Sequence, residues 1–264
     1  MITIILVIFR TDPLKLNKII KKINENYKII IVDNSSNYNF SKINISHKTS
    51  IIRSENVGNG AAINKALKKC ETRFAMYMDI DIDIDNNFLV RFIDTLKKIQ
   101  EFGILVPNHG NFKITDSVFE FYKGEASVML YDIENLKKIN FFDENFFLYY
   151  EEMDLLHRCK INNIKCYLIP YLIIKHHRAS SIENEGNDLK CLRIWHYMWS
   201  MFYFYKKNFG YISALKKTSK FLIKDLIVLL ISIFFFDFKK MKLRFFRLYG
   251  LISSILGLKS FLRP

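Results

Sequence analysis

Short aliphatic runs alternate with segments of helical spacing through the first hundred residues. Residues 2–9 (ITIILVIF) and 28–32 (KIIIV) are continuous runs rich in β-branched residues and bounded by polar turn residues, a pattern typical of strands buried on both faces of a parallel sheet. Residues 13–24 lie between them and carry apolar side chains every three or four positions. The three segments together predict a βαβ unit.

The alternation continues with a strand near Ile51, a helix over 60–69, a strand over 73–79 and a helix over 88–100. It predicts an α/β fold, a Rossmann-like sheet flanked by helices. Such sheets bind ligands at the carboxyl ends of their strands. The residues that follow the predicted strands are polar, and they include Phe9, Arg10, Thr11, Asp33 and the run NVGNG at 56–60. The fingerprints GxGxxG and GxxxxGK[ST] are absent from the sequence, which disfavours a nicotinamide enzyme or a P-loop NTPase.

Composition narrows the class further. The chain has 264 residues, of which half are hydrophobic and 15% aromatic, with nine glycines and four prolines; these values exclude collagenous and low-complexity chains. The four cysteines are too irregularly spaced for a zinc ribbon or a CxxC redox pair and indicate a reducing compartment. The apolar start has no basic region and no small-residue cleavage site, so we expect a buried first strand and no signal peptide.

Charge divides the chain into two parts. Residues 206–264 hold 13 Lys or Arg and two Asp or Glu, whereas residues 1–205 hold 27 and 24, within a net charge of +14. A nearly neutral body is therefore followed by a basic, apolar tail. This shift places the expected domain boundary between residues 205 and 206.

Residues 78–86 read MDIDIDIDN. If this run is a strand, its side chains alternate, and one face carries Asp79, Asp81, Asp83 and Asp85. A hard divalent cation, Mg²⁺ or Mn²⁺, that also contacts phosphate groups would relieve the repulsion between these carboxylates. Alternatively, the later members leave the sheet in a turn and Asp85 caps the next helix, while the first two are ordinary solvated carboxylates.

These motifs, in this order, resemble the landmarks of family 2 glycosyltransferases of the GT-A fold, and most closely the rhamnosyltransferase-like branch that builds bacterial surface polysaccharides. The motifs are FRT at 9–11, VDNSS at 32–36, NVGNGAAIN at 56–64 and DID at 79–81. The resemblance implies that Asp33 binds the nucleobase. It also implies that Asn56, Gly58 and Asn64 line the nucleotide pocket and that Asp79 and Asp81 form the DxD motif for metal and diphosphate.

The second half of the chain extends the resemblance. GEASVM at 124–129 is similar to the acceptor-side loop of the family, which makes Gly124 a candidate substrate contact, and residues 142–158 follow the pattern FDExFFxYxEDxDLxxR. Two departures matter: the family often has Asp where this chain has Glu152, and many relatives have two acids where Asp33 is followed by Asn34. The exact placement of the longer Glu152 carboxylate and the preference for a nucleobase are therefore open.

An inverting glycosyl transfer needs a carboxylate that removes the proton of the acceptor hydroxyl, and positive groups that stabilise the leaving diphosphate. Glu151, Glu152 and Asp154 cluster at the start of a predicted helix, and the resemblance favours Glu152 as the base. Alternatively these acids cap the helix and Asp154 pairs with Arg158, which we otherwise count as a substrate contact.

The basic run KHHR at 175–178 follows the apolar run at 166–174, and it contains two candidate residues, His176 and Arg178. The family pattern HxxxxS matches His176 to Ser181, and it makes His176 a third metal ligand or a diphosphate contact, against a purely structural histidine. Arg178 is a candidate phosphate contact, against a solvated loop arginine.

The tail holds an uncharged segment at 226–236 of only 11 residues, whereas a membrane-spanning helix needs about 20. Basic residues flank it on both sides. We expect amphipathic helices on an anionic membrane surface, where each basic residue contributes roughly 1 kcal/mol of attraction. The alternative is a helical cap on the catalytic domain.

The sequence thus predicts an inverting, metal-dependent glycosyltransferase with Mn²⁺ or Mg²⁺ as cofactor. It would move a sugar from a nucleotide-diphosphate donor to a glycan or lipid-linked glycan at the cytoplasmic face of the bacterial inner membrane. The nucleotide-sugar half spans 1–100, the acceptor half 101–205 and the membrane-associating region 206–264. Alternatives are a polyprenyl-phosphate glycosyltransferase, a catalytically silent membrane scaffold and a nucleic-acid binder; the acidic run and the lack of a nucleic-acid motif disfavour the last.

Overall fold

The computed structural model describes residues 2–23, 27–84, 87–124, 127–176 and 187–264, with only the backbone described at residues 176 and 187. The chain forms two compact units. Unit 1 comprises Met1–Asp143 and Glu152–Glu183, and unit 2 comprises Glu144–Glu151 and Asn184–Pro264. The chain therefore passes from unit 1 to unit 2 and back within the segment that leads to the candidate base.

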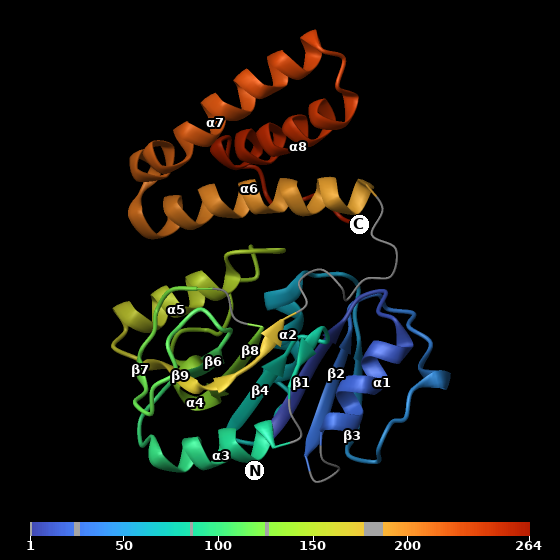
Figure 1. Ribbon diagram of the computed structural model, residues 1–264, viewed down its shortest axis with the longest axis vertical. Coiled ribbons are helices and arrows are strands. Elements are labelled where there is room, and N and C mark those ends of the chain that lie inside the picture. Colours follow the sequence, from blue (N-terminus) through green and yellow to red (C-terminus); the bar gives the residue numbers. More distant parts are fainter. Residues whose placement is uncertain (1, 24–26, 85–86, 125–126, 177–186) are drawn as a thin grey trace. The chain divides into compact units, whose positions relative to one another are not determined.

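The regular elements follow the predicted order through the first hundred residues (Figure 1). The strands are β1 (Ile2–Ile8), β2 (Lys28–Asp33), β3 (Thr49–Arg53), β4 (Phe74–Met78), β5 (Ile82–Asp83), β6 (Ile104–Asn108), β7 (Phe119–Glu120), β8 (Val128–Asp132), β9 (Cys166–Ile173) and β10 (Lys175–His176). The helices are α1 (Pro13–Lys22), α2 (Asn59–Leu67), α3 (Phe88–Lys98), α4 (Ile133–Lys137), α5 (Glu151–Ile161), α6 (Asn187–Phe209), α7 (Tyr211–Phe234) and α8 (Phe238–Ile255), with a 3₁₀ turn at Phe40–Lys42.

Unit 1 is built on an eight-stranded mixed sheet with the order β3-β2-β1-β4-β8-β6-β9-β7. The strands β3, β2, β1 and β4 are parallel, whereas β8 is antiparallel to both of its neighbours, β4 and β6. The chain adds β2 and β3 on one side of β1 and then places β4 on the other. This reversal of strand order creates the switch point where α/β sheets bind ligands. The predicted α/β fold, a GT-A-like mixed sheet flanked by helices, is confirmed.

Apolar side chains on both faces of the sheet hold the helices in place. Ile4 and Leu6 of β1 face a cluster that includes side chains from α1 and α3. Ile5 of the same strand faces the opposite cluster, to which α2, α4 and α5 contribute. The continuous aliphatic strands of the sequence are explained by this burial, because the central strands are covered on both faces.

Unit 2 holds a bundle of the three long helices α6, α7 and α8, of which α7 and α8 correspond to the helical tail that the sequence predicts (Figure 1). A core of Met198, Met201, Phe202, Ala214 and Leu251 lies between them. Gly250 permits the close approach of α8 to α6, since a Cβ there would lie 2.2 Å from the carbonyl oxygen of Trp195.

An ion triad joins α7 to α8. The carboxylate of Asp225, only 1% exposed, accepts hydrogen bonds from Arg244 (Nη1 to Oδ1, 2.6 Å) and Arg247 (Nε to Oδ2, 2.6 Å). A carboxylate with this little exposure needs charged partners, because burying an unpaired charge is strongly unfavourable. Two cations share one anion here, so the triad keeps a net positive charge.

The structure divides the chain earlier than the change in charge suggests. Residues 205 and 206 lie inside α6, which runs without a break from Asn187 to Phe209. The larger part of unit 2 begins at Asn184, because α6 packs with α7 and α8. Trp195 and Trp199 of α6 are buried. Within the described residues, no helix is long and apolar enough to cross a membrane.

The C-terminal segment packs against α6 through His196. Nε2 of His196 donates to the carbonyl of Leu262 (3.0 Å), so Nδ1 is the acceptor for the hydroxyl of Ser260 (3.1 Å). The indole of Trp199 donates to the carbonyl of Leu258 (2.9 Å). Phe147 stacks on His196 with ring centroids 4.5 Å apart. The chain end thereby braces the segment Glu144–Glu151.

This packing predicts a specific acid sensitivity. Burial lowers the pKa of His196 from 6.5 to about 4, so the stabilising neutral form is complete above pH 6.5, and stability falls as the pH drops from about 6.5 towards 4. We expect His196→Gln to lose this component, which amounts to at most about 3 kcal/mol. Urea unfolding at pH 7 and pH 4.5, followed by the fluorescence of Trp195 and Trp199, measures it. Equal pH dependence in both proteins would contradict the prediction.

Candidate functional site

The candidate site lies at the edge of the sheet where the strands β1 to β4 end. These strands are parallel, so the residues that follow them emerge on the same side. The antiparallel strand β8 begins at this edge, and the amide of Asp79 donates to the carbonyl of Ser127 (2.8 Å) just before it. Motifs far apart in the sequence therefore meet along one edge.

The first motif forms a tight turn after β1. Thr11 is buried and its hydroxyl accepts the amide of Phe9 (3.2 Å). Arg10 has a left-handed φ of +47°, and its guanidinium lies over the ring of Phe9 at 5.0 Å. A left-handed arginine is strained, and such residues are often found at ligand sites. The exposed guanidinium of Arg10 thus extends from the edge of the sheet.

Asp33 organises the loop after β2. Its side chain is fully buried, Oδ1 accepts from the amide (3.0 Å) and hydroxyl (2.7 Å) of Ser35, and Oδ2 accepts from the amide of Tyr38 (2.9 Å). Arg53 also lies 3.4 Å from Oδ2. Both carboxylate oxygens are therefore engaged within the fold, and a contact of Asp33 with a nucleobase stays a prediction.

The third motif is a network around Asn56. The Asn34 amide donates to Asn56 Oδ1 (3.0 Å) and accepts from the amide of Val57 (3.1 Å). Gly58 has a φ of +92° and begins α2, a conformation that favours glycine. The amino end of α2, which has no acidic residue in its first turn, thereby reaches the site edge, and helix amino ends favour phosphate groups.

The described contacts of Asn64 are with the backbone of Phe142, and its place in the nucleotide pocket stays a prediction. It is 2% exposed and exchanges two hydrogen bonds with the backbone of Phe142: Nδ2 donates to the carbonyl (2.9 Å), and Oδ1 accepts from the amide (3.0 Å). This pair ties α2 to the segment that precedes α5. The motif position thus sets the approach of two elements of the site.

The prediction that four aspartates share one strand face is wrong. The strand β4 ends at Met78, a turn follows at residues 80–81, and Ile82–Asp83 form the separate strand β5. The turn sends neighbouring carboxylates to different partners: Tyr77 donates to Asp79, whereas Asp83 pairs with Lys22 of α1 (2.7 Å). Repulsion is relieved by this separation. Asp81 is buried to 8% exposure in the turn between them, and Asp85 lies outside the described residues.

Tyr77 links the DxD motif to the second half of the chain. Its buried hydroxyl hydrogen-bonds to Asp79 and lies 3.3 Å from Oδ1 of Asn59. Burial raises the pKa of Tyr77 well above its usual value, the charge and hydrogen bond of Asp79 raise it further, and the charge of Glu152 adds to the effect. The charge of Glu152 is the smallest of these contributions, so its carboxylate lies within electrostatic range of the phenol that binds Asp79.

The other acidic residues of α5 are placed differently. Asp154 is fully buried and accepts from Nε of Arg158 (2.7 Å), whose guanidinium also donates to the carbonyls of Ile139 (2.5 Å) and Phe141 (2.6 Å). The i, i+4 pair is present, and the described contacts of Arg158 are internal to the fold. Glu151 is 2% exposed at the start of the helix.

The remaining predicted residues surround this edge to different extents. The backbone of His176 in β10 pairs with Ile82 of β5, directly after Asp81, so the fold brings the chain at residue 176 to the DxD turn. Gly124 has a φ of +148°, and a Cβ there would lie 2.6 Å from the ring of Phe121. Arg178 lies outside the described residues.

Three polar residues of the edge were missed by the motif analysis. His109 and Ser127 connect the end of β6 to the start of β8: the Ser127 amide donates to Nε2 of His109 (3.2 Å), and the hydroxyl lies 2.9 Å from the same atom. Asn108 holds the loop after β6 through Gly110 and Phe112. Asn108 and His109 end the buried run VPNH at 106–109, and this position at a strand end was the available signal in the sequence.

The donor set suits a hard divalent cation only with help from a ligand. Within the described residues, no group of three or more His, Cys, Asp or Glu side chains could hold a metal ion. Asp79 and Asp81 supply carboxylate oxygens in one turn, and oxygen donors suit Mg²⁺ and Mn²⁺. Diphosphate oxygens would complete the coordination, so the residues fit a metal that binds together with a nucleotide.

Comparisons with known proteins agree with this geometry. A sequence profile of glycosyl transferase family 2 matches residues 4–165. No curated protein gives a significant match. Among solved structures, TarS 1–349 of S. aureus has a TM-score of 0.53 at 13% identity, over 97% of this chain and 91% of that one.

Two further similar structures are complexes with a nucleotide or nucleotide sugar and Mn²⁺. The mannosyltransferase PcManGT from Pyrobaculum calidifontis, in complex with GDP-Man and Mn²⁺, has a TM-score of 0.57 at 11% identity, over 97% of this chain and 87% of that one. GalNAc-T7 with UDP, GalNAc and Mn²⁺ has a TM-score of 0.59 at 11% identity, over 81% of this chain and 47% of that one. At these identities the likeness shows the fold. With the profile covering more than half of the chain, the protein belongs to glycosyl transferase family 2 and is a nucleotide-sugar glycosyltransferase of the GT-A fold.

Proposed function

We propose that the protein is an inverting, metal-dependent glycosyltransferase that moves a sugar, with rhamnose the first to test, from a nucleotide-diphosphate donor to a lipid-linked or growing glycan. The observation that carries this proposal is the two-aspartate turn after β4, where Tyr77 donates to Asp79 and also experiences the charge of Glu152. It supports a metal–diphosphate site and a general base at one edge of the sheet, which are the two requirements of the reaction.

The donor is held by the sheet edge. The turn at Asp79 and Asp81 faces the diphosphate together with the metal, and the amino end of α2 adds backbone N–H groups. Arg10 extends from the neighbouring loop as a further phosphate contact. The loops ordered by Asp33 and Asn56 form the nucleoside side of the pocket.

Asp81 and Asp79 would hold the metal, with His176 as an additional ligand. When bound, a divalent cation neutralises the charge that develops on the leaving nucleoside diphosphate. Tyr77 donates its proton to Asp79 and so fixes the orientation of that carboxylate. Because burial keeps Tyr77 protonated, this donor persists at neutral pH.

Glu152 acts as the base. The acceptor hydroxyl attacks the anomeric carbon from the face opposite the diphosphate, its proton passes to Glu152, and the bond from carbon to phosphate oxygen breaks. Asp154 is an unsuitable base because Arg158 already neutralises it within the core. On this proposal, α5 carries a structural acid, Asp154, and a reactive one, Glu152.

The acceptor is expected at a membrane surface. The turn between α7 and α8 exposes four phenylalanines to more than 70% each: Phe234, Phe235, Phe236 and Phe238. Lysines and arginines flank this hydrophobic tip, among them Lys239, Lys240 and Arg244. Apolar side chains with adjacent positive charge are complementary to an anionic lipid surface.

This proposal extends to the biological setting. The motifs that resemble the rhamnosyltransferase-like branch support a role in surface polysaccharide synthesis, such as O-antigen, lipooligosaccharide or capsule, at the cytoplasmic face of the bacterial inner membrane. A nucleotide sugar is a cytoplasmic donor, so the reaction requires access from that face. Transfer to a polyprenyl phosphate is the alternative outcome of an acceptor screen.

The metal assignment predicts that Asp81→Asn weakens Mn²⁺-dependent binding of a nucleoside diphosphate at least tenfold, since the amide removes an anionic ligand. Asp83→Asn is the matched control, because Asp83 pairs with Lys22 across a partly exposed contact. Calorimetric titration of both variants with UDP and with GDP, each with Mn²⁺, measures the difference. Undiminished affinity in Asp81→Asn would exclude this carboxylate from the metal site.

The base assignment predicts that Glu152→Gln keeps donor binding and loses transfer by a factor of about 10² to 10⁴, since an amide cannot accept the proton. Turnover of wild type, Glu152→Gln and Glu151→Gln with the same donor and acceptor tests it. If Glu151→Gln alone loses turnover, the base is Glu151 instead.

The hydrophobic tip predicts that replacing Phe234, Phe235 and Phe236 by Ser reduces binding to phosphatidylglycerol vesicles at least tenfold, because each buried phenylalanine contributes about 1.5–3 kcal/mol. A triple Ser variant of Leu14, Ile114 and Ile161, which are exposed elsewhere, is the control. Salt should weaken wild-type binding only in part, since screening acts on the charges alone. If the triple Phe variant and the triple control variant sediment equally with vesicles, the hydrophobic tip is not the membrane contact.

A further inference from the structure

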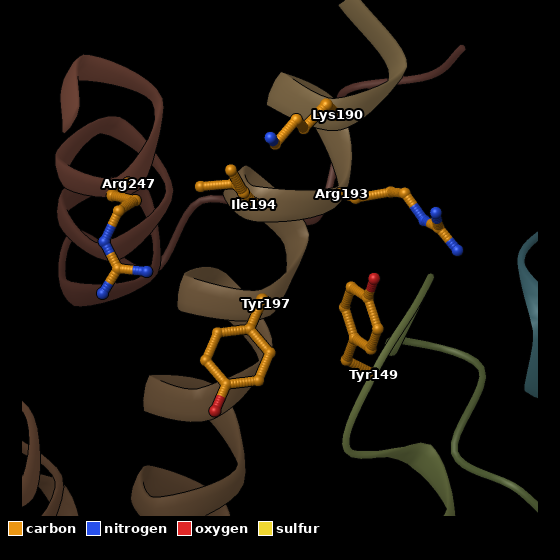
Figure 2. Close-up of a pocket in the computed structure, with 6 residues that line it drawn as sticks. All are labelled: Tyr149, Lys190, Arg193, Ile194, Tyr197 and Arg247. Atoms are coloured by element: carbon orange, nitrogen blue, oxygen red, sulfur yellow. The ribbon is translucent and has the colours of Figure 1, made fainter. Parts of the chain in front are cut away.

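Unit 2 contains a pocket of about 420 Å³ that combines cations with aromatic side chains (Figure 2). Its lining comes from α6, from α8 and from the segment Glu144–Glu151, all within this unit. The lining residues are Tyr149, Lys190, Arg193, Ile194, Tyr197 and Arg247. The volume lies in the range of small-molecule sites, about 300–1,000 Å³.

The electrostatics of this pocket favour an anion. Among the described lining residues, three of six are cationic and none is acidic. Arg247 shares the carboxylate of Asp225 with Arg244, so one negative charge balances two positive ones. The acid in the first turn of α6, Asp188, pairs with Lys242 of α8 and is not a lining residue.

The position of the cations within α6 supports the same conclusion. Lys190 lies in the first turn of the helix and Arg193 in the second, near the end where the helix dipole disfavours positive charge. A bound anion would compensate the unfavourable position of Lys190 in the first turn. Figure 2 shows Lys190, Arg193 and Tyr197 arising from successive turns of α6, with Tyr149 beside Tyr197.

The two tyrosines add a polar and aromatic wall. The rings of Tyr149 and Tyr197 meet edge to face with centroids 5.6 Å apart. Tyr149 and Tyr150 both have a left-handed φ of +67°, a strained conformation that is common at ligand sites.

We infer that this pocket binds the phosphate or diphosphate group of the acceptor, with a lipid-anchored diphosphate as its source. Planar guanidinium groups, an ammonium and phenol hydroxyls are suited to phosphate oxygens. The inference rests on the proposed transfer to a lipid-linked glycan and deepens it by naming the group that is recognised.

Two features connect the pocket to that reaction. Tyr149 precedes Glu152 by three residues, so their Cα atoms are at most about 11 Å apart, whatever the conformation between them. Unit 2 also carries the exposed phenylalanines of the α7–α8 turn. A lipid diphosphate has its tail in the bilayer and its charge at the surface, and one compact unit offers complementary surfaces to both parts.

The test uses the full chain and phosphatidylcholine vesicles that contain a polyprenyl diphosphate. Lys190→Gln and the double variant Lys190→Gln/Arg193→Gln are compared with Lys216→Gln/Lys259→Gln, which removes the same charge outside the pocket. We expect binding to fall at least tenfold in the double variant and measurably in Lys190→Gln, with little change in the control. The charge-conserving variant Lys190→Arg/Arg193→Lys should keep most of the affinity.

Three further arms identify the ligand. Vesicles of equal charge made with phosphatidylglycerol should bind all variants alike, and inorganic pyrophosphate should bind more weakly than the lipid diphosphate. Equal affinity for pyrophosphate would support phosphate recognition and overturn the lipid source. Equal losses in the pocket variant and the control, or no loss in either, would overturn the pocket.

Donor binding separates this inference from the proposed function. Titration with UDP and GDP, each with Mn²⁺, depends on Asp81 and should be the same in the wild type and in the pocket variants. Retained donor binding with lost diphosphate-vesicle binding supports the pocket by itself. Diphosphate-vesicle binding by the wild type that is lost in the pocket variant, together with no transfer by the wild type from any nucleotide sugar tested, would leave the pocket supported and the proposed reaction contradicted.

Discussion

The antiparallel pairing of β8 with β4 is the constraint on which the site depends. Four parallel strands place their carboxyl ends at one edge, and the reversed strand starts at the same edge and brings Ser127 next to Asp79. Without the reversal, the chain after β4 would supply only loops of the nucleotide half. With it, Ser127 of the second half lies next to the DxD turn, and the charge of Glu152 acts on Tyr77. The buried Tyr77 then links the two halves of the site through charge and hydrogen bonding.

A second constraint is the path of the chain through two compact units. The segment Glu144–Glu151 belongs to unit 2, where Phe147 packs on His196 and the carbonyl of Leu148 accepts from Ser200 (2.9 Å). The next residue, Glu152, belongs to unit 1. The candidate base is therefore the first residue after the chain returns from unit 2 to unit 1.

Much of this arrangement could be predicted from the sequence, and the failures have physical reasons. Continuous aliphatic runs identified β1, β2 and β4 because central strands are buried on both faces. The prediction that the aspartates of the acidic run share one face failed because it assumes that the strand continues. A turn after Met78 separates Asp79 from Asp83. Charge placed a boundary inside α6 because composition does not register that the helix packs as one piece. The pairing of His109 with Ser127 and of Asn64 with Phe142 depends on tertiary contacts, which no local pattern encodes.

The central claim is that metal and diphosphate bind at the Asp79–Asp81 turn beside Glu152. Anomalous diffraction from crystals of the full chain grown with a nucleoside diphosphate and Mn²⁺ tests it most directly. The account predicts one manganese peak within coordination distance of the Asp81 carboxylate, with diphosphate oxygens completing its shell and the nucleoside extending towards the loop of Asp33. A manganese peak remote from both aspartates, or a diphosphate bound away from this edge of the sheet, would contradict it.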